Sequence, residues 1–109
     1  MRRDDVVREL KRSARRLIRA HPEVRRVLLF GSYARGDFGV RSDADVLLVL
    51  STSPHERYFD RIPDFLGFFL DMSVPVDIFP YTEAEEERML RRGNPLIRSA
   101  FGGIVVAEA

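Results

Sequence analysis

The chain of 109 residues contains no cysteine, which excludes a disulfide framework and a thiolate metal site but leaves the cellular compartment open. No apolar run approaches the roughly 20 residues of a membrane-spanning helix, and the N-terminal region lacks the apolar core of a signal peptide. The formal net charge is only +1, so no global electrostatic field points to DNA or a membrane as the main partner. We therefore expect a cytoplasmic protein.

What is present describes an ordinary folded domain. Hydrophobic residues make up 45% of the chain and charged residues 32%, and this length suits one hydrophobic core. Lys11 is the only lysine among 18 basic residues, a bias from which no function follows. Because there is no internal repeat, low-complexity segment or linker, we expect a single domain over residues 1–109.

Apolar patterning predicts alternating helices and strands. Continuous apolar runs predict strands at residues 24–30, 43–50, 74–79 and 104–106. Helical spacing together with capping and stop residues predicts helical segments at residues 4–20, 32–36, 53–71, 83–92 and 94–101. Pro75 near the start of the third strand places that strand at the edge of a sheet.

The predicted helix at residues 53–71 has a distinct start signal. The segment 53–56, of sequence SPHE, combines an N-cap serine, a first-position proline and a capping-box glutamate. Pro63 is expected to kink or split this helix. The apolar residues between positions 58 and 70 recur at helical spacing, so we expect them to pack in the core.

The segment 31–36, of sequence GSYARG, directly follows the first predicted strand. Its two glycines have the spacing of a P-loop, but Asp37 and Phe38 stand where lysine and serine or threonine are required. What remains is a strand that ends in Gly31 and Ser32 at a helical turn, where N–H groups and a hydroxyl can bind phosphate. The alternative for Gly31 is a plain turn glycine.

Two aspartates open the second predicted strand. Asp43 and Asp45 are two residues apart, so their side chains point to the same face. Five apolar residues follow, which indicates a buried strand. Two unpaired carboxylates at the start of such a strand cost free energy unless a cation such as Mg²⁺ lies between them. Asp77 of the third strand is either an outward-facing acid or, if the strands are neighbours, the third ligand of a site for two metal ions.

These motifs together resemble the polymerase-β-type nucleotidyltransferase superfamily. Its pattern is G-S-x-A-R-G, then S-D-x-D-[LV], then an isolated aspartate on the next strand, and the chain matches it at 31–36, 42–46 and 77. By size the chain is most similar to the minimal nucleotidyltransferases, such as the antitoxins of HEPN–MNT pairs. The resemblance implies an α/β (α+β) polymerase-β-like fold, in which a small mixed sheet of three to four strands is flanked by helices.

The resemblance also implies roles for individual residues. The implied metal ligands and catalytic residues are Asp43, Asp45 and Asp77. The implied nucleotide-binding residues are Gly31, Ser32 and Arg35. Asp43 and Asp45 would ligate two Mg²⁺ ions, and Asp77 would ligate the catalytic ion and help to activate an acceptor hydroxyl. Arg35 would either steady the phosphates or pin its own loop.

The implied reaction is attack by a hydroxyl on the α-phosphorus of a nucleoside triphosphate, with ATP as the expected substrate and pyrophosphate as the leaving group. Because 109 residues leave no room for a domain that grips the acceptor, the acceptor must come from a partner or from a neighbouring subunit of a homo-oligomer. In the antitoxin-like relatives, the resemblance implies AMP transfer onto a tyrosine of a HEPN-domain RNase toxin.

Two hypotheses from other functional classes stay open. A non-catalytic binding module would neutralise its partner by complex formation, through the first helix or the phenylalanine-rich helix. An RNA-binding protein would use the basic face between Arg8 and Arg19, although a run of charges is more often a solvated helix face. Nucleic acid is therefore not the partner that we expect.

Overall fold

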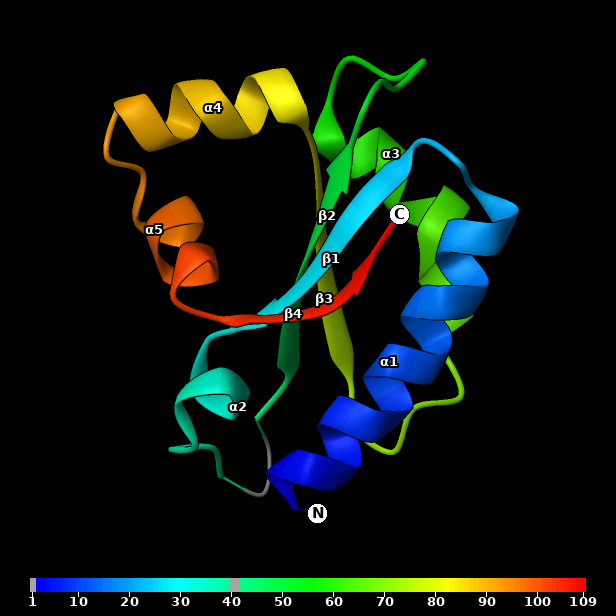
Figure 1. Cartoon of the computed structure of the whole chain (residues 1–109), viewed down its shortest axis with the longest axis vertical. Helices are drawn as coiled ribbons and strands as arrows, with labels where there is room; N and C mark the ends of the chain where they lie inside the picture. Colours follow the sequence, from blue (N-terminus) through cyan, green and yellow to red (C-terminus); the bar gives the residue numbers. More distant parts are fainter. Residues whose placement is uncertain (1, 40–41) are drawn as a thin grey trace.

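Four strands form one mixed sheet at the centre of the fold, in the order β3-β2-β1-β4 (Figure 1). The structure is a computed structural model that describes residues 2–39 and 42–109. The strands are β1 (Val24–Phe30), β2 (Ala44–Leu50), β3 (Val76–Thr82) and β4 (Ile104–Glu108). β1 runs antiparallel to both β2 and β4, whereas β2 and β3 are parallel. The mixed sheet flanked by helices confirms the predicted fold class.

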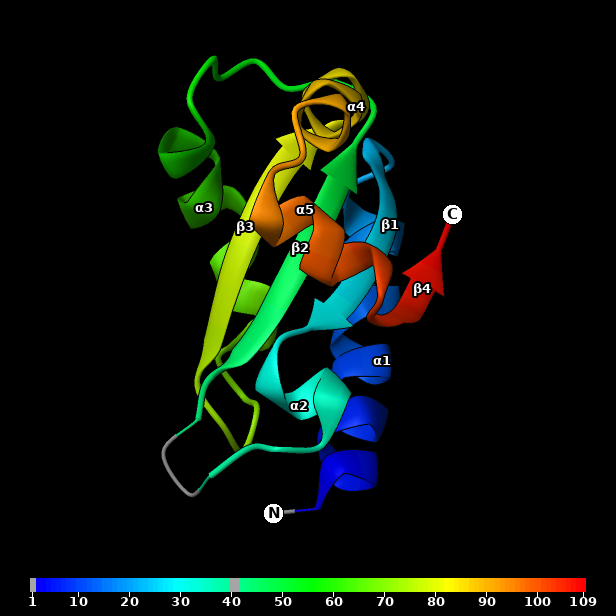
Figure 2. The same ribbon diagram turned by 90° about the vertical axis from the view of Figure 1, so that its left-hand side faces the viewer.

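Helices cover both faces of this sheet. They are α1 (Arg3–Ala20), α2 (Ser32–Arg35), α3 (Tyr58–Leu66), the 3₁₀ helix η1 (Gly67–Phe69), α4 (Glu83–Arg91) and α5 (Pro95–Phe101). α1 and α3 lie on one side of the sheet, and α4 and α5 lie on the other (Figures 1 and 2). No helix in the described part of the chain is long and apolar enough to cross a membrane.

The strands bury alternate residues on the two faces. On β2, Val46 and Leu48 belong to the core under α1 and α3, whereas Leu47 and Val49 pack towards α4 and α5. All four side chains are at most 1% exposed. The unbroken apolar run of β2 therefore reflects burial on both faces of a central strand, as the sequence predicts.

Most predicted boundaries are confirmed within a residue or two. β1 spans the predicted residues, and Thr82 and Glu85 form the reciprocal hydrogen bonds of a capping box at the start of α4. Asn94 caps α5 through its side-chain oxygen. β3 lies at the sheet edge, as Pro75 predicts. The predicted polar connection 36–42 includes residues 40 and 41, which lie outside the described residues.

The predicted helix start at residues 53–56 is wrong, because α3 begins only at Tyr58. The Ser53 hydroxyl instead accepts a hydrogen bond from the N–H of His55, two residues on, at 3.1 Å. The guanidinium of Arg61, only 3% exposed, donates to the carbonyl of His55 at 2.9 Å and to that of Glu56 at 3.0 Å. These side-chain hydrogen bonds use carbonyls that a helix would need for its own backbone hydrogen bonds.

Three further expectations, two about this helix and one about the third strand, are corrected. The apolar stripe at 58–70 is only partly core: Phe65 and Phe69 are 3% exposed, whereas Phe59 is 66% and Leu70 is 74% exposed. The helix runs unbroken through Pro63 and changes to the tighter η1 after Leu66, which rotates the residues that follow. The third strand covers Val76–Thr82 rather than 74–79, because its ladder with β2 continues to the end of that strand.

Candidate active site

Three aspartates converge at one end of β2 and β3. Asp45 and Asp77 are direct partners in the parallel register, so their side chains point to the same face of the sheet. Asp43 lies two residues before Asp45, immediately ahead of β2. Phe30, the last residue of β1, pairs with Asp45, so the glycine that follows β1 reaches the same place. The convergence that the sequence made conditional on neighbouring strands is therefore present.

The carboxylates lie on the α4–α5 side of the sheet. The residues that alternate with them, Ala44 and Val76, pack in the core under α1 and α3. α5 lies over the middle of the sheet, and the short helix α2 flanks the end where β2 and β3 begin (Figure 2). The site therefore occupies the part of this face between α5 and α2.

The carboxylates perturb each other electrostatically. Partial burial raises the pKa of Asp45, and the neighbouring charges of Asp77 and Asp43 raise it further, while Arg35 opposes the rise. Desolvation also raises the pKa of Asp77, and the Asp43 carboxylate adds to the rise through its charge and a hydrogen bond. Mutual repulsion of this kind is what a bound cation relieves.

Gly31 approaches the carboxylates more closely than any other residue type could. It has φ 75° and ψ −151°, a backbone region essentially confined to glycine. A Cβ atom added there would collide with Oδ2 of Asp45. Gly31 is therefore more than a plain turn glycine, because its missing side chain gives the Asp45 carboxylate its place.

Ser32 is the first residue of α2, which is held in place by aromatic packing. Tyr33 is 2% exposed and stacks on Phe38 with ring centroids 4.3 Å apart. The Ser32 carbonyl accepts hydrogen bonds from the N–H groups of Gly36 and Asp37. This packing presents the first turn of α2 beside Gly31 and the carboxylates.

Arg35 has a partner that the sequence analysis did not single out. Its Nε donates to Oδ2 of Asp37 at 3.2 Å, and both side chains are well exposed. The spacing of two residues between opposite charges is the only sequence signal for this pair. Arg35 thus contacts its own loop through Asp37. Its positive charge also lowers the pKa of Asp45, so Arg35 contributes charge to the site as well.

The donor set suits a hard divalent cation. Carboxylate oxygens are the ligands that Mg²⁺ prefers, and burial together with the neighbouring carboxylates raises the pKa values of Asp45 and Asp77, so a cation would stabilise their charged forms. Within residues 2–39 and 42–109, no three His, Cys, Asp or Glu side chains are already close enough to hold a metal ion. The two-metal assignment therefore stays a prediction.

Comparison with known proteins places this geometry in context. A sequence model described as "Nucleotidyltransferase domain" matches residues 7–101. A Methanocaldococcus jannaschii protein with the provisional name protein adenylyltransferase is 38% identical over 50 residues, which cover 46% of this chain and 48% of that protein. A bifunctional uridylyltransferase/uridylyl-removing enzyme of Pseudomonas putida is 39% identical over 46 residues, which cover 42% of this chain and 5% of the enzyme.

The chain thus spans about half the length of the first of these relatives and a small part of the second. Among solved structures, a provisionally assigned nucleotidyltransferase from Sulfolobus solfataricus superimposes with a TM-score of 0.71 and 23% identity, over 97% of this chain and 83% of that one. A toxin–antitoxin complex with AMP-PNP superimposes with a TM-score of 0.54 and 17% identity, over 91% and 73% of the two chains. At these identities, the structural likeness shows a shared fold.

Proposed function

The chain belongs to the nucleotidyltransferase domain family, and we propose that it transfers AMP from ATP to a hydroxyl group of a partner protein. The provisional name of the Methanocaldococcus jannaschii relative supports a protein as acceptor, and the toxin–antitoxin complex with AMP-PNP supports an adenine nucleotide and a toxin partner. The acceptor that we propose is a tyrosine of a HEPN-domain RNase toxin. The observation that carries the proposal is the direct pairing of Asp45 with Asp77.

The proposed metal ligands are Asp43, Asp45 and Asp77, whose charges otherwise repel one another. Two Mg²⁺ ions at these carboxylates would stabilise the attacking and leaving oxygens of an in-line displacement at phosphorus. The chain's own contribution is to place Asp45 and Asp77 side by side on paired strands, with Asp43 immediately ahead of β2 and with Gly31 close to the Asp45 carboxylate.

In the proposed reaction, the acceptor oxygen forms a bond to the α-phosphorus, and the bond from that phosphorus to the bridging oxygen of the β-phosphate breaks. Pyrophosphate leaves with the electron pair of the broken bond. Asp77, with its raised pKa, is suited to take the proton of the acceptor hydroxyl. Gly31, the N-cap of α2, and Ser32, its first residue, would bind the β- and γ-phosphates through N–H groups and a hydroxyl.

The test is label transfer from ATP to a co-expressed HEPN-domain toxin in the presence of Mg²⁺. We expect label on the toxin when the α-phosphate is radioactive and none when the γ-phosphate is radioactive. Asp45→Asn and Asp77→Asn should each slow the transfer about 1,000-fold or more, which is a barrier change of about 4 kcal/mol. Asp60→Asn, which changes an exposed carboxylate on α3, is the matched control and should transfer label normally. Equal labelling by the Asp45/Asp77 double variant would overturn the proposal.

A second candidate function has one observation in its favour. Phe59 and Leu70 are large apolar side chains that are 66% and 74% exposed, as expected of a module that neutralises its partner by binding alone. The two candidates differ in the fate of the aspartate variants. A binding module would still neutralise the toxin with Asp45 and Asp77 changed to asparagine, whereas a transferase would not.

A further inference from the structure

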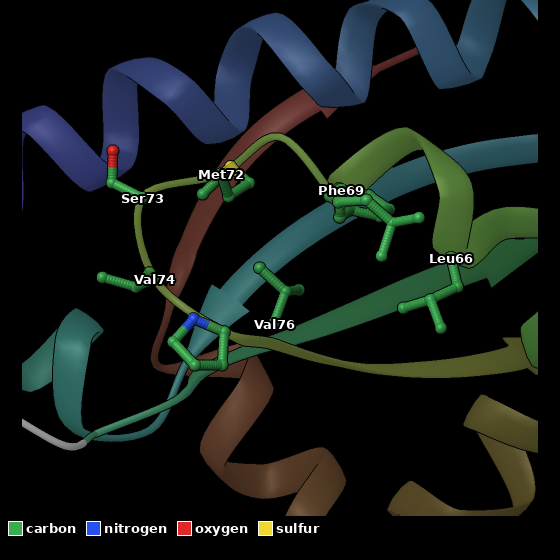
Figure 3. Close-up of a pocket in the computed structure, with 8 residues that line it drawn as sticks. Leu66, Phe69, Met72, Ser73, Val74 and Val76 are labelled. Atoms are coloured by element: carbon green, nitrogen blue, oxygen red, sulfur yellow. The ribbon is translucent and has the colours of Figure 1, made fainter.

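An apolar groove of about 490 Å³ opens between η1 and the start of β3 (Figure 3). Its lining includes Leu66, Phe69, Leu70, Met72, Val74 and Val76. In Figure 3, Leu66 and Phe69 reach into it from α3 and η1, and Val76 faces them from β3. Leu70 on its lining is 74% exposed, so an apolar side chain in the groove would remove it from water.

The groove and the candidate active site share one stretch of backbone. The carbonyl of Pro75, a residue that lines the groove, accepts a hydrogen bond at 2.9 Å from the N–H of Ala44, the residue between Asp43 and Asp45. Val76 lines the groove, and the next residue is Asp77. Successive side chains of a strand point to opposite faces, so the groove and the carboxylates flank the edge of β3 on its two sides.

The outer edge of β3 can accept another strand only near this end. Among the described residues, β3 is an edge strand that pairs with β2 alone. At its far end, Pro80 has no N–H to donate, and its carbonyl already accepts a hydrogen bond from Nη1 of Arg61 at 3.0 Å. An added strand is therefore confined to the part of β3 around Val76 and Ile78, beside both the groove and Asp77.

We propose that the groove binds an apolar side chain of the acceptor protein, immediately adjacent in sequence to the residue that carries the acceptor hydroxyl. The acceptor segment would lie extended along the free edge of β3, about 4.8 Å from it, and its side chains would alternate across that edge. One side chain then enters the groove, and its neighbour in sequence presents its hydroxyl at Asp77. This inference rests on the proposed protein nucleotidylation and names its substrate class.

The test compares two extended peptides that differ only in the residue directly before a single tyrosine, which is leucine in one and serine in the other. With Mg²⁺ and α-labelled ATP, the leucine peptide should be labelled with a kcat/KM about ten-fold higher, the effect of burying one leucine side chain. Leu70→Gln should reduce this preference to about three-fold, because half of the leucine contact, and so half of its free energy, would then be lost to a polar side chain.

A matched control and a second measurement keep the two proposals separable. Leu90→Gln changes another exposed leucine, 42% exposed on α4, and should leave the preference intact. Methyl NMR of the wild-type chain with millimolar peptide should show shifts at Leu66, Leu70 and Val76 with the leucine peptide only.

Equal labelling of the two peptides, or an equal effect of Leu90→Gln, would overturn the inference. If neither peptide is labelled, the methyl shifts test whether the groove binds the leucine side chain, and the absence of shifts overturns the inference. Shifts of the same methyl groups on raising the protein concentration alone would assign the groove to a second copy of the chain and also overturn it. Failure of the toxin-labelling assay, with the methyl shifts present, would instead reject the proposed transfer and leave the groove as a peptide-binding site.

Discussion

Replacement of Gly31 by alanine tests the local geometry on which the candidate site depends. The backbone of Gly31, at φ 75° and ψ −151°, costs about 1–3 kcal/mol for a residue with a Cβ atom. The new Cβ would also collide with Oδ2 of Asp45. Forcing that carboxylate off its preferred rotamer adds about 1 kcal/mol. Together these terms predict a loss of about 2–4 kcal/mol in the free energy of unfolding.

Gly36→Ala is the matched control, because Gly36 also has a positive φ, 88°, yet nothing lies within 4 Å of its Cβ position. It should cost only about 1–2 kcal/mol, the backbone term alone. Urea denaturation measures both values. In thermal scans, the 2–4 kcal/mol of Gly31→Ala corresponds to a fall in Tm of about 10–20 °C.

A double-mutant cycle isolates the contact with the carboxylate. Combining Gly31→Ala with Asp45→Ala removes the colliding oxygen, so the double variant should be about 1 kcal/mol more stable than the sum of the single changes predicts. If Gly31→Ala costs no more than Gly36→Ala, or if the cycle is additive, Gly31 does not define the position of Asp45 and the reasoning fails.

Three further predictions follow from the charges. Asp45→Asn should raise the free energy of unfolding at pH 7, because it removes a partly buried charge that the neighbouring carboxylates repel. Because folding raises the pKa of Asp45, its charge destabilises the fold above that pKa, and urea denaturation should show this gain vanishing at low pH. The pKa of Glu85 is lowered, because hydrogen bonds from Arg61 and Thr82 outweigh the effect of its burial. The ionised Glu85 therefore stabilises the fold, and this stabilisation is lost as pH falls through the pKa of the folded state. Glu85→Gln should make the free energy of unfolding depend less steeply on pH at acidic pH, as measured by urea denaturation. Arg35→Ala should change the free energy of unfolding by less than about 0.5 kcal/mol, since its ion pair with Asp37 is exposed. The same change should weaken ATP binding about ten-fold, as measured by calorimetry. Unchanged binding would show that Arg35 only contacts its own loop.

Local signals predicted the parts of the fold that local interactions decide. The capping box of Thr82 and Glu85 needs no distant partner, and the unbroken apolar run of β1 marks a buried strand whichever strands pair with it; both are confirmed. The segment 53–56 has equally good local signals for a helix start, yet the buried Arg61 takes its carbonyls and α3 begins later. Side-chain hydrogen bonds of this kind leave no trace in the spacing of apolar residues.

The candidate site was predictable to a similar extent. The spacing of Asp43 and Asp45 on one strand indicates two carboxylates on one face, but only the parallel pairing of β2 with β3 brings Asp77 beside them. The collision that a side chain at Gly31 would cause depends on a contact between two chain segments. The groove depends on the change to η1 after Leu66, which leaves Leu70 exposed, and the helical spacing of the sequence predicted a buried leucine there.

The most direct test of the central claim is a crystal of this chain soaked with Mn²⁺ and AMP-PNP, with anomalous scattering used to locate the metal. The account predicts metal peaks about 2.0–2.3 Å from carboxylate oxygens of Asp43, Asp45 and Asp77. It also predicts that the β- and γ-phosphates lie against Gly31 and Ser32. Metal bound to the phosphates alone, or a nucleotide bound away from β2 and β3, would contradict it.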